Sequence, residues 1–334
     1  MSLSGPQSFL VTGLPKSGTT WFMRLLNCID GVRCTGEGRF FASGLRDVPS
    51  LWDGLAEGIG PWYRYVALRK GSGVGADGDI ATVNRRNFLP EGVLVEGTDR
   101  MVAALAGQVV RSCLAAGTRE LAGVRAVGDK TPVTRPVELR RASKALPEAK
   151  LLVLRRDVND FVVSYLFHYW RAMRDARPDR NMDHVGVDDF LHIERYMQGH
   201  NLAGAGLASP ETCARLAGVW CEVRTEIGRL SRQTPDLVLV VDYERLWADP
   251  AQELARTLQF LQIEYSAAAV QKAVDATSID AVERSSDNAL KNHVRRGRPW
   301  DHRRHLGREA VEAIAGTLRA AGFGDGKMES GGLV

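Results

Sequence analysis

Short apolar runs alternate with longer amphipathic stretches along the chain. Five runs rich in valine and leucine, at residues 9–12, 93–96, 124–127, 151–154 and 237–241, predict strands that are buried on both faces. Between them, apolar residues recur with helical spacing at residues 20–29, 100–116, 135–145, 157–174 and 211–231. This alternation predicts an α/β fold with a central parallel β-sheet flanked by helices.

Length and composition fit one domain of this kind. The chain has 334 residues, of which 44% are hydrophobic and 25% are charged, so a core of useful size can form. We expect a single domain over residues 1–323 and a disordered tail over residues 324–334. Glycine-rich stretches at residues 70–79 and 199–209 predict loops, which either lie at the surface or gate a site.

Charge and targeting signals narrow the class of protein. The net charge of +4 is too small for a nucleic-acid-binding surface. The five cysteines include no C-x-x-C pair, which predicts free thiols in a reducing compartment. The sequence has neither a signal-peptide pattern nor an apolar stretch of about 18 residues that would span a membrane. We therefore expect a cytoplasmic protein without a transmembrane segment or nucleic-acid partner, and the sequence does not indicate its oligomeric state.

A phosphate-binding loop is predicted at residues 13–21, between a strand and a helix. Backbone N–H groups and the helix dipole at such a junction favour an anion. Gly13 and Gly18 have the spacing of a Walker A loop, but the position after the second glycine is Thr19, where a Walker loop has lysine. The lysine here is Lys16, inside the loop, where it lies nearer the group bound by the loop itself.

The stretch Pro-Lys-Ser-Gly-Thr-Thr-Trp at residues 15–21 resembles the 5′-phosphosulfate loop of sulfotransferases that use 3′-phosphoadenosine-5′-phosphosulfate (PAPS). The resemblance implies the P-loop NTPase-like sulfotransferase fold over most of the chain. It also implies that the loop lysine contacts the sulfuryl-bearing phosphate, that the next residues hold the 5′-phosphate, and that the tryptophan packs on adenine. These roles belong here to Lys16, Ser17, Gly18, Thr19, Thr20 and Trp21.

PAPS carries a 3′-phosphate as well, so a second anion site is required. Arg156 and Ser164 follow the strand predicted at residues 151–154 and resemble the family's 3′-phosphate segment, an arginine followed eight residues later by serine. Arginine suits this role because its guanidinium binds phosphate with two parallel hydrogen bonds. The resemblance therefore implies that Arg156 and Ser164 hold the 3′-phosphate.

The basic segment at residues 293–305 resembles the family's loop that closes over the 3′-phosphate, with basic surface as the plain alternative. Its start matches at Arg295, Arg296 and Gly297, whereas Trp300 and His302 replace a glycine and a tryptophan of the family pattern. Two weaker resemblances, at Tyr243 and at the pair Thr277 and Ser278, imply further nucleotide contacts, and core or capping roles remain open for them.

Sulfuryl transfer takes a proton from the acceptor hydroxyl and places charge on the leaving phosphate, so it requires a base and cations. Lys16 and Lys130 are the predicted cations, and no metal is needed if they supply the charge. One branch of the family has histidine two residues after the second lysine, where this chain has Pro132. Glu37 lies in a stretch that resembles the Glu-x-His-Phe-Phe of another branch and is the candidate base, with a loop carboxylate or His200 as the alternatives.

The predicted reaction is in-line transfer of a sulfuryl group from PAPS to an acceptor hydroxyl, with release of 3′-phosphoadenosine-5′-phosphate (PAP). The alternatives are a P-loop kinase and a non-catalytic adenine-nucleotide-binding protein. This chain lacks the Walker lysine that a P-loop kinase requires. Residues 39–87 and 170–210, which we expect to line the acceptor pocket, mix aromatic residues with arginines. This mixture fits a small molecule, a lipid or a glycan as the acceptor.

Overall fold

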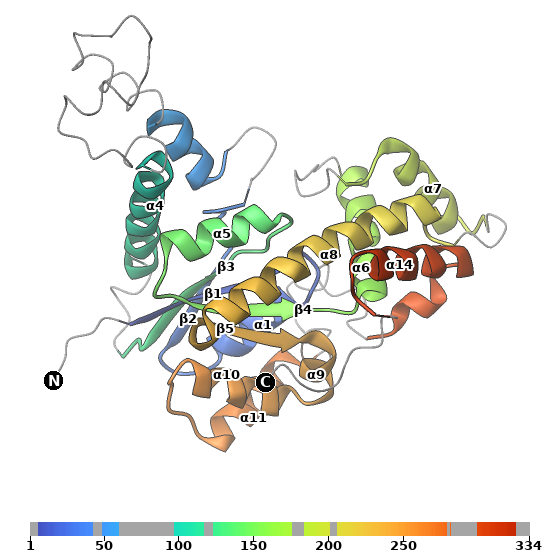
Figure 1. Cartoon of the computed structure of the whole chain (residues 1–334). Coiled ribbons are helices and arrows are strands. Elements are labelled where there is room, and N and C mark those ends of the chain that lie inside the picture. The colour runs from blue at the N-terminus through green and yellow to red at the C-terminus, as the bar shows by residue number, and fades with distance from the viewer. Residues whose placement is uncertain are drawn as a thin grey trace, which may run out of the picture.

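A computed structural model describes residues 6–42, 49–59, 97–116, 123–175, 184–200, 206–278, 281 and 299–324. Within these residues one five-stranded parallel sheet has the order β2-β3-β1-β4-β5 (Figure 1). The strands are β1 (Gln7–Gly13), β2 (Val32–Gly36), β3 (Ala126–Lys130), β4 (Lys150–Arg155) and β5 (Val238–Asp242). The predicted α/β fold with a central parallel sheet is confirmed.

Helices cover both faces of the sheet, as expected for strands that are apolar on both sides. The main helices are α1 (Thr19–Asn27), α4 (Gly97–Ala116), α5 (Pro136–Ala145), α6 (Val158–Arg174), α7 (Val187–Met197), α8 (Pro210–Gln233), α9 (Tyr243–Ala248), α10 (Pro250–Phe260), α11 (Ala267–Thr277) and α14 (Arg308–Ala320). Residues 51–59 are also helical, and two short 3₁₀ turns are η2 (Pro235–Leu237) and η3 (Asp301–Arg304). The five predicted helices are present with boundaries shifted by at most a few residues, whereas α7, α9, α10, α11 and α14 were not predicted.

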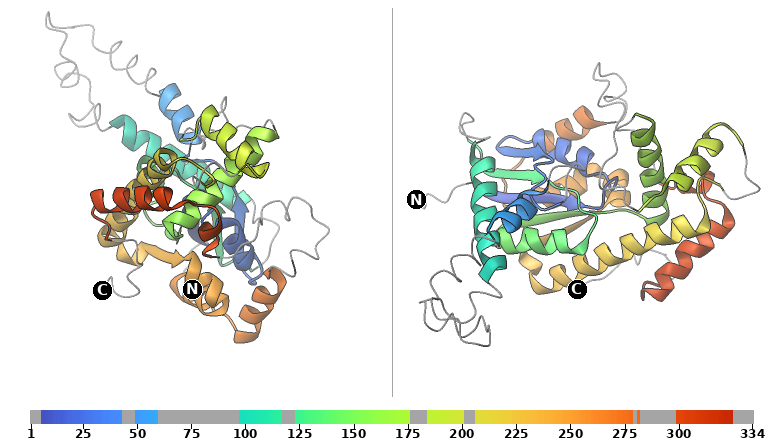
Figure 2. Two further views of the ribbon diagram at one scale, coloured as in Figure 1. Left: turned by 90° about the vertical axis from the view of Figure 1, so that its right-hand side faces the viewer. Right: turned by 90° about the horizontal axis from the view of Figure 1, so that it is seen from above.

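Alternation along the strands divides the core in two. Leu10, Leu151 and Val153 belong to a cluster that includes residues of α4, α5, α6, α8 and α14. Phe9 and Leu152, their neighbours along the strands, belong to a cluster with α1, α10 and α11 on the opposite face. α7 and α14 lie at the end of the molecule away from α4 (Figure 2).

Two predicted strands need comment. The strand predicted at residues 93–96 lies outside the described residues, while β2 was not predicted. The strand predicted at residues 124–127 is instead β3, Ala126–Lys130, because Gly128 continues the strand rather than ending it. A Cβ on Gly128 would lie 2.5 Å from the ring of Phe9, so glycine allows the two strands to pack closely here. Lys130 is therefore the last residue of the strand.

The predicted loops and tail are described only in part. Residues 70–79 and 325–334 lie outside the described residues, and of residues 199–209 only 199–200 and 206–209 are described. Gly206 forms an isolated antiparallel bridge with Leu306, which ties this loop to the segment before α14. None of the helices in the described part of the chain is long and apolar enough to cross a membrane. The domain limits at residues 1–323 stay a prediction.

Candidate active site

The predicted phosphate loop is a tight turn between β1 and α1. Gly18 precedes the helix with a φ of 91°, and Lys16 also has a left-handed backbone, with a φ of 69°. The side chains of Ser17 and Thr19 are buried. The backbone N–H of Val133 donates to the carbonyl of Gly13 over 2.9 Å, so the segment after β3 holds the start of the loop. The helix N-terminus and its loop form the kind of junction that binds anions.

Lys130 projects from the end of β3 toward this loop. Its ammonium group donates to the hydroxyl of Thr20 over 3.3 Å and contacts a carboxylate oxygen of Glu37 at 2.5 Å. The Lys130 side chain is only 7% exposed, whereas that of Glu37 is 45% exposed. Three residues predicted separately, on three different elements, therefore meet at the carboxyl ends of the parallel strands, where α/β folds place their sites.

Glu37 lies directly after β2 in an unusual backbone conformation. Its φ of 48° is left-handed, and its N–H donates to the carbonyl of Lys130 over 2.9 Å. Arg39, which stands where the resembled stretch has histidine, brings its guanidinium within 3.7 Å of the second carboxylate oxygen. A carboxylate between two cations is favoured in the ionised form that a base requires.

The loop lysine lies in a strongly positive environment. Burial, together with the positive charges of Arg171, Arg156 and Lys130, lowers the pKa of Lys16 to about 8. Arg171, on α6, has the largest of these charge effects and was not predicted. A sequence signal for it exists, since Arg171 lies seven residues after Ser164 and thus on the same face of a helix. Clustered cations with a lysine that resists protonation indicate a site built for an anion.

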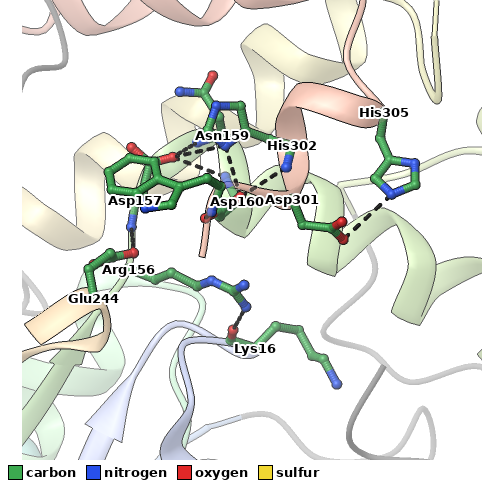
Figure 3. A network of polar contacts seen from close by, with 10 residues as sticks. Lys16, Arg156, Asp157, Asn159, Asp160, Glu244, Asp301, His302 and His305 are labelled. Carbon is green, nitrogen blue, oxygen red and sulfur yellow. Dashed lines mark hydrogen bonds and ion pairs between the residues drawn. The ribbon is translucent and has the colours of Figure 1, made fainter. Parts of the chain in front are cut away.

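Arg156, predicted to bind the 3′-phosphate, is buried beside the loop. Its Nη1 donates to the carbonyl of Lys16 over 3.0 Å (Figure 3). Its guanidinium lies 4.5 Å from the ring centroid of Tyr243. Its Nε has no hydrogen-bond partner within the described residues. Ser164 is half-buried in the second turn of α6.

Aromatic rings surround the start of α1. Trp21 packs edge-on against Tyr243 and Trp247, with ring centroids 6.1 Å and 6.0 Å apart. Tyr243 is 5% exposed and lies against Gly18, where a Cβ would be 2.4 Å from its ring. Adenine contacts by Trp21 and Tyr243 stay predictions.

The remaining predicted nucleotide contacts divide into two groups. Thr277 and Ser278 are at the end of α11, where their hydroxyls donate to the carbonyls of Ala273 and Asp275 over 2.9 Å and 3.0 Å. These bonds fit the capping alternative, and a nucleotide role stays a prediction. Arg295, Arg296 and Gly297 lie outside the described residues.

The segment where the sequence departs from the family pattern is bound to α6. Asp160, buried in the first turn of that helix, accepts from the N–H of Trp300 over 2.6 Å. It also accepts from His302, over 3.0 Å from the backbone and 2.8 Å from the ring (Figure 3). Burial acts to raise the pKa of Asp160, but these hydrogen bonds hold it below its ordinary value. No sequence motif marks Asp160, because its partners are 140 or more residues away.

The same cluster contains three potential metal ligands. One atom each from Asp157, Asp160 and His302 lies within 4.8 Å of the others. Asp157 already accepts hydrogen bonds from the N–H groups of Asn159 and Asp160 as the N-cap of α6, and Asp160 already accepts from His302. These bonds account for the three side chains without an ion, and the expectation that no metal is needed stays a prediction.

A family model described as "Sulfotransferase domain" matches residues 6–321. A comparison with curated proteins gives no match.

Among solved structures, the mouse sulfotransferase SULT7A1 complexed with PAP is 15% identical, and the likeness covers 95% of this chain and 84% of that chain, with a TM-score of 0.48. The sulfotransferase domain of the Synechococcus PCC 7002 olefin synthase is 16% identical, and the likeness covers 94% of this chain and 95% of that domain, with a TM-score of 0.42. Retinol dehydratase in complex with androsterone and PAP is 15% identical, and the likeness covers 94% of this chain and 80% of that chain, with a TM-score of 0.45. All three TM-scores are below 0.5, so the assignment of this chain to a family rests on the match to the family model.

Proposed function

We propose that this chain, which belongs to the sulfotransferase family, takes a sulfuryl group from PAPS and uses Glu37, Lys130 and Lys16 to move it to an acceptor hydroxyl. The contact that supports this most directly is the 2.5 Å pair between Glu37 and Lys130, beside the phosphate loop. The proposal draws support from this contact because a carboxylate and an ammonium group lie together beside the N-terminus of α1, where we expect the 5′-phosphate.

In the proposed mechanism Glu37 accepts the proton of the acceptor hydroxyl as its oxygen attacks sulfur. The bond between sulfur and the bridging oxygen of the nucleotide breaks, and its electron pair stays on that oxygen of PAP. Lys16 and Lys130 stabilise this developing charge, which is the role of preorganised cations in transfer of this kind. Because Lys130 is buried and Lys16 is half-buried, their attraction for the leaving oxygen is screened less than at an open surface.

The nucleotide is proposed to lie along the carboxyl ends of β1 and β4. The loop residues from Ser17 to Thr20 would hold its 5′-phosphate, and Arg156 with Ser164 would hold the 3′-phosphate. Arg156 supports this assignment because its buried Nε has no partner in the described chain while its Nη1 binds the loop. A phosphate at this position would satisfy a buried donor that otherwise costs free energy.

Labelled PAPS tests this function. The purified chain is incubated with labelled PAPS and with a phenol, a sterol and a monosaccharide as acceptor hydroxyls, and labelled product and PAP are measured. We propose a cytoplasmic enzyme whose acceptor is a small molecule, a lipid or a glycan, so at least one class should yield product with an equal amount of PAP. Failure to release PAP with any acceptor, water included, would contradict the proposal.

Substitution of Glu37 tests the base. Glu37→Gln keeps the shape but cannot take a proton, so turnover should fall by about 10²-fold or more, the usual contribution of a general base. Glu148→Gln is the matched control, because Glu148 also pairs with a cation, Arg111 at 2.9 Å, and is similarly exposed, but lies outside the site. Near-normal turnover of Glu37→Gln would remove Glu37 from the mechanism.

A further inference from the structure

Asp129 is a carboxylate that the proposed chemistry does not use, and it contacts the residue that follows Glu37. Asp129, the residue before Lys130 in β3, is 1% exposed. It accepts from the hydroxyl of Thr35 over 2.8 Å and from the hydroxyl of Thr131 over 2.6 Å. Both of its oxygens also accept from the N–H of Gly38, each over 3.2 Å. A buried carboxylate with several hydrogen bonds fixes the groups that donate to it.

These donors lie on both sides of Glu37. Thr35 comes two residues before Glu37 and pairs with Asp129 in the sheet register, and Gly38 comes directly after Glu37. Glu37 itself donates through its N–H to the carbonyl of Lys130. The segment at residues 35–38, which runs from the end of β2 past Glu37, is thus bound to the end of β3 through Thr35, Glu37 and Gly38. This binding sustains the left-handed backbone of Glu37, with a φ of 48°, which a non-glycine residue adopts only when its surroundings impose it.

We propose that Asp129 is a positioning residue, which holds the segment at residues 35–38 so that the Glu37 carboxylate faces Lys130 and the phosphate loop. The proposal rests on the proposed role of Glu37 as the base. Among the described residues, the hydrogen bonds of the Asp129 carboxylate go to Thr35, Gly38 and Thr131, none of which is proposed to react. Its effect on turnover must therefore pass through Glu37.

Hydrogen exchange tests the positioning directly and needs no acceptor. Asp129→Asn keeps the size of the side chain but replaces one accepting oxygen with a donor, so the peptide spanning residues 35–38 should exchange about tenfold faster, as expected for loss of a hydrogen bond to a charged group. Thr131→Val is the matched control, because it removes one bond to Asp129 but leaves those from Thr35 and Gly38 intact. Its exchange should stay within about twofold of the parent chain. Equal exchange in Asp129→Asn and the parent chain would overturn the proposal.

A double-mutant cycle tests the link to catalysis. Turnover of labelled PAPS with water as the acceptor is measured for Asp129→Asn, Glu37→Gln and the double variant, with PAP affinity measured alongside. Asp129→Asn should lower turnover about tenfold with PAP affinity unchanged, because displacing a catalytic group by a fraction of an ångström has effects of this order. It should have no further effect once Glu37 is glutamine.

The outcomes separate the two hypotheses. If Asp129→Asn slows the Glu37→Gln enzyme by the same factor as the parent enzyme, the positioning role is wrong while the base stands. If Glu37→Gln turns over normally, the base role is wrong, whatever the exchange data show. Should Asp129→Asn fail to fold, Thr35→Val removes one of the same bonds from the other side. Thr35→Val should then speed the exchange of amide hydrogens in residues 35–38, and an unchanged exchange rate would overturn the proposal.

Discussion

Replacing Gly18 with alanine tests the geometry of the phosphate loop. Gly18 has a φ of 91°, and an added Cβ would lie 2.4 Å and 2.6 Å from two ring carbons of Tyr243. The ring cannot move freely, because Tyr243 is 5% exposed and lies between Trp21 and the guanidinium of Arg156. Gly18→Ala must therefore shift either the loop or the ring.

Two costs add in the free energy of unfolding. The left-handed backbone costs a non-glycine residue about 1–2 kcal/mol. Overpacking against a buried ring costs about 1–3 kcal/mol. We expect Gly18→Ala to be destabilised by about 2–5 kcal/mol in total. If the strain is relieved by movement of the loop, PAP affinity should fall as well, because the N–H groups at the start of α1 lose their alignment.

Urea unfolding and PAP calorimetry measure these effects. Gly316→Ala is the matched control, since Gly316 lies in α14 and an added Cβ would meet nothing within 4 Å. The same chemical change should there stabilise the chain by about 0.5–1 kcal/mol, because alanine is the better helix former. The reasoning is refuted if Gly18→Ala unfolds at the urea concentration of the parent chain and binds PAP equally well.

Three further predictions concern the charged side chains of the site and its need for a metal ion. Because the pKa of Lys16 is lowered to about 8, PAP affinity should fall as the pH rises past that value and the lysine loses its proton, and Lys16→Met should flatten this dependence in calorimetric titrations. Arg156→Lys should weaken PAP binding about tenfold to hundredfold, while ADP, which has no 3′-phosphate, should bind nearly as before. Arg155→Lys is the control, since Arg155 pairs with Asp242. If Arg156→Lys weakened the binding of PAP and ADP equally, the assignment of Arg156 to the 3′-phosphate would be contradicted. Chelation with EDTA should leave turnover of labelled PAPS unchanged, whereas loss of turnover that Mg²⁺ restores would contradict a metal-free mechanism.

Local features were predictable from the sequence. The strand, loop and helix at residues 7–27 follow from an apolar run, two glycines and an amphipathic pattern that are contiguous in the chain. The strand β2 was missed because Val-Arg-Cys-Thr-Gly is short and carries an arginine, so its conformation depends on pairing with β3. The strand predicted at residues 124–127 stopped before Gly128, because the close packing of Gly128 against Phe9 of a neighbouring strand is not visible in the sequence.

The contacts that assemble the site were less accessible. Glu37 and Lys130 were both candidates, but their pairing joins residues 93 positions apart and depends on β2 lying beside β3. Asp129 and Asp160 were missed because a buried carboxylate has no signature apart from its partners, and except for Thr131 these partners come from distant segments. The candidate chemical groups came from motifs that resemble the sulfotransferase family, whereas the supporting hydrogen bonds required the fold.

The most direct measurement of the central claim compares nucleotides by thermal unfolding. PAP should raise the unfolding midpoint of the chain, because its two phosphate sites match the loop and Arg156, and ligand binding to the folded state stabilises it. ATP with Mg²⁺ should have little effect, because Thr19 stands where a Walker loop has its lysine. Stabilisation by ATP with Mg²⁺ and none by PAP would contradict the claim that this site binds a 3′-phosphorylated sulfuryl donor.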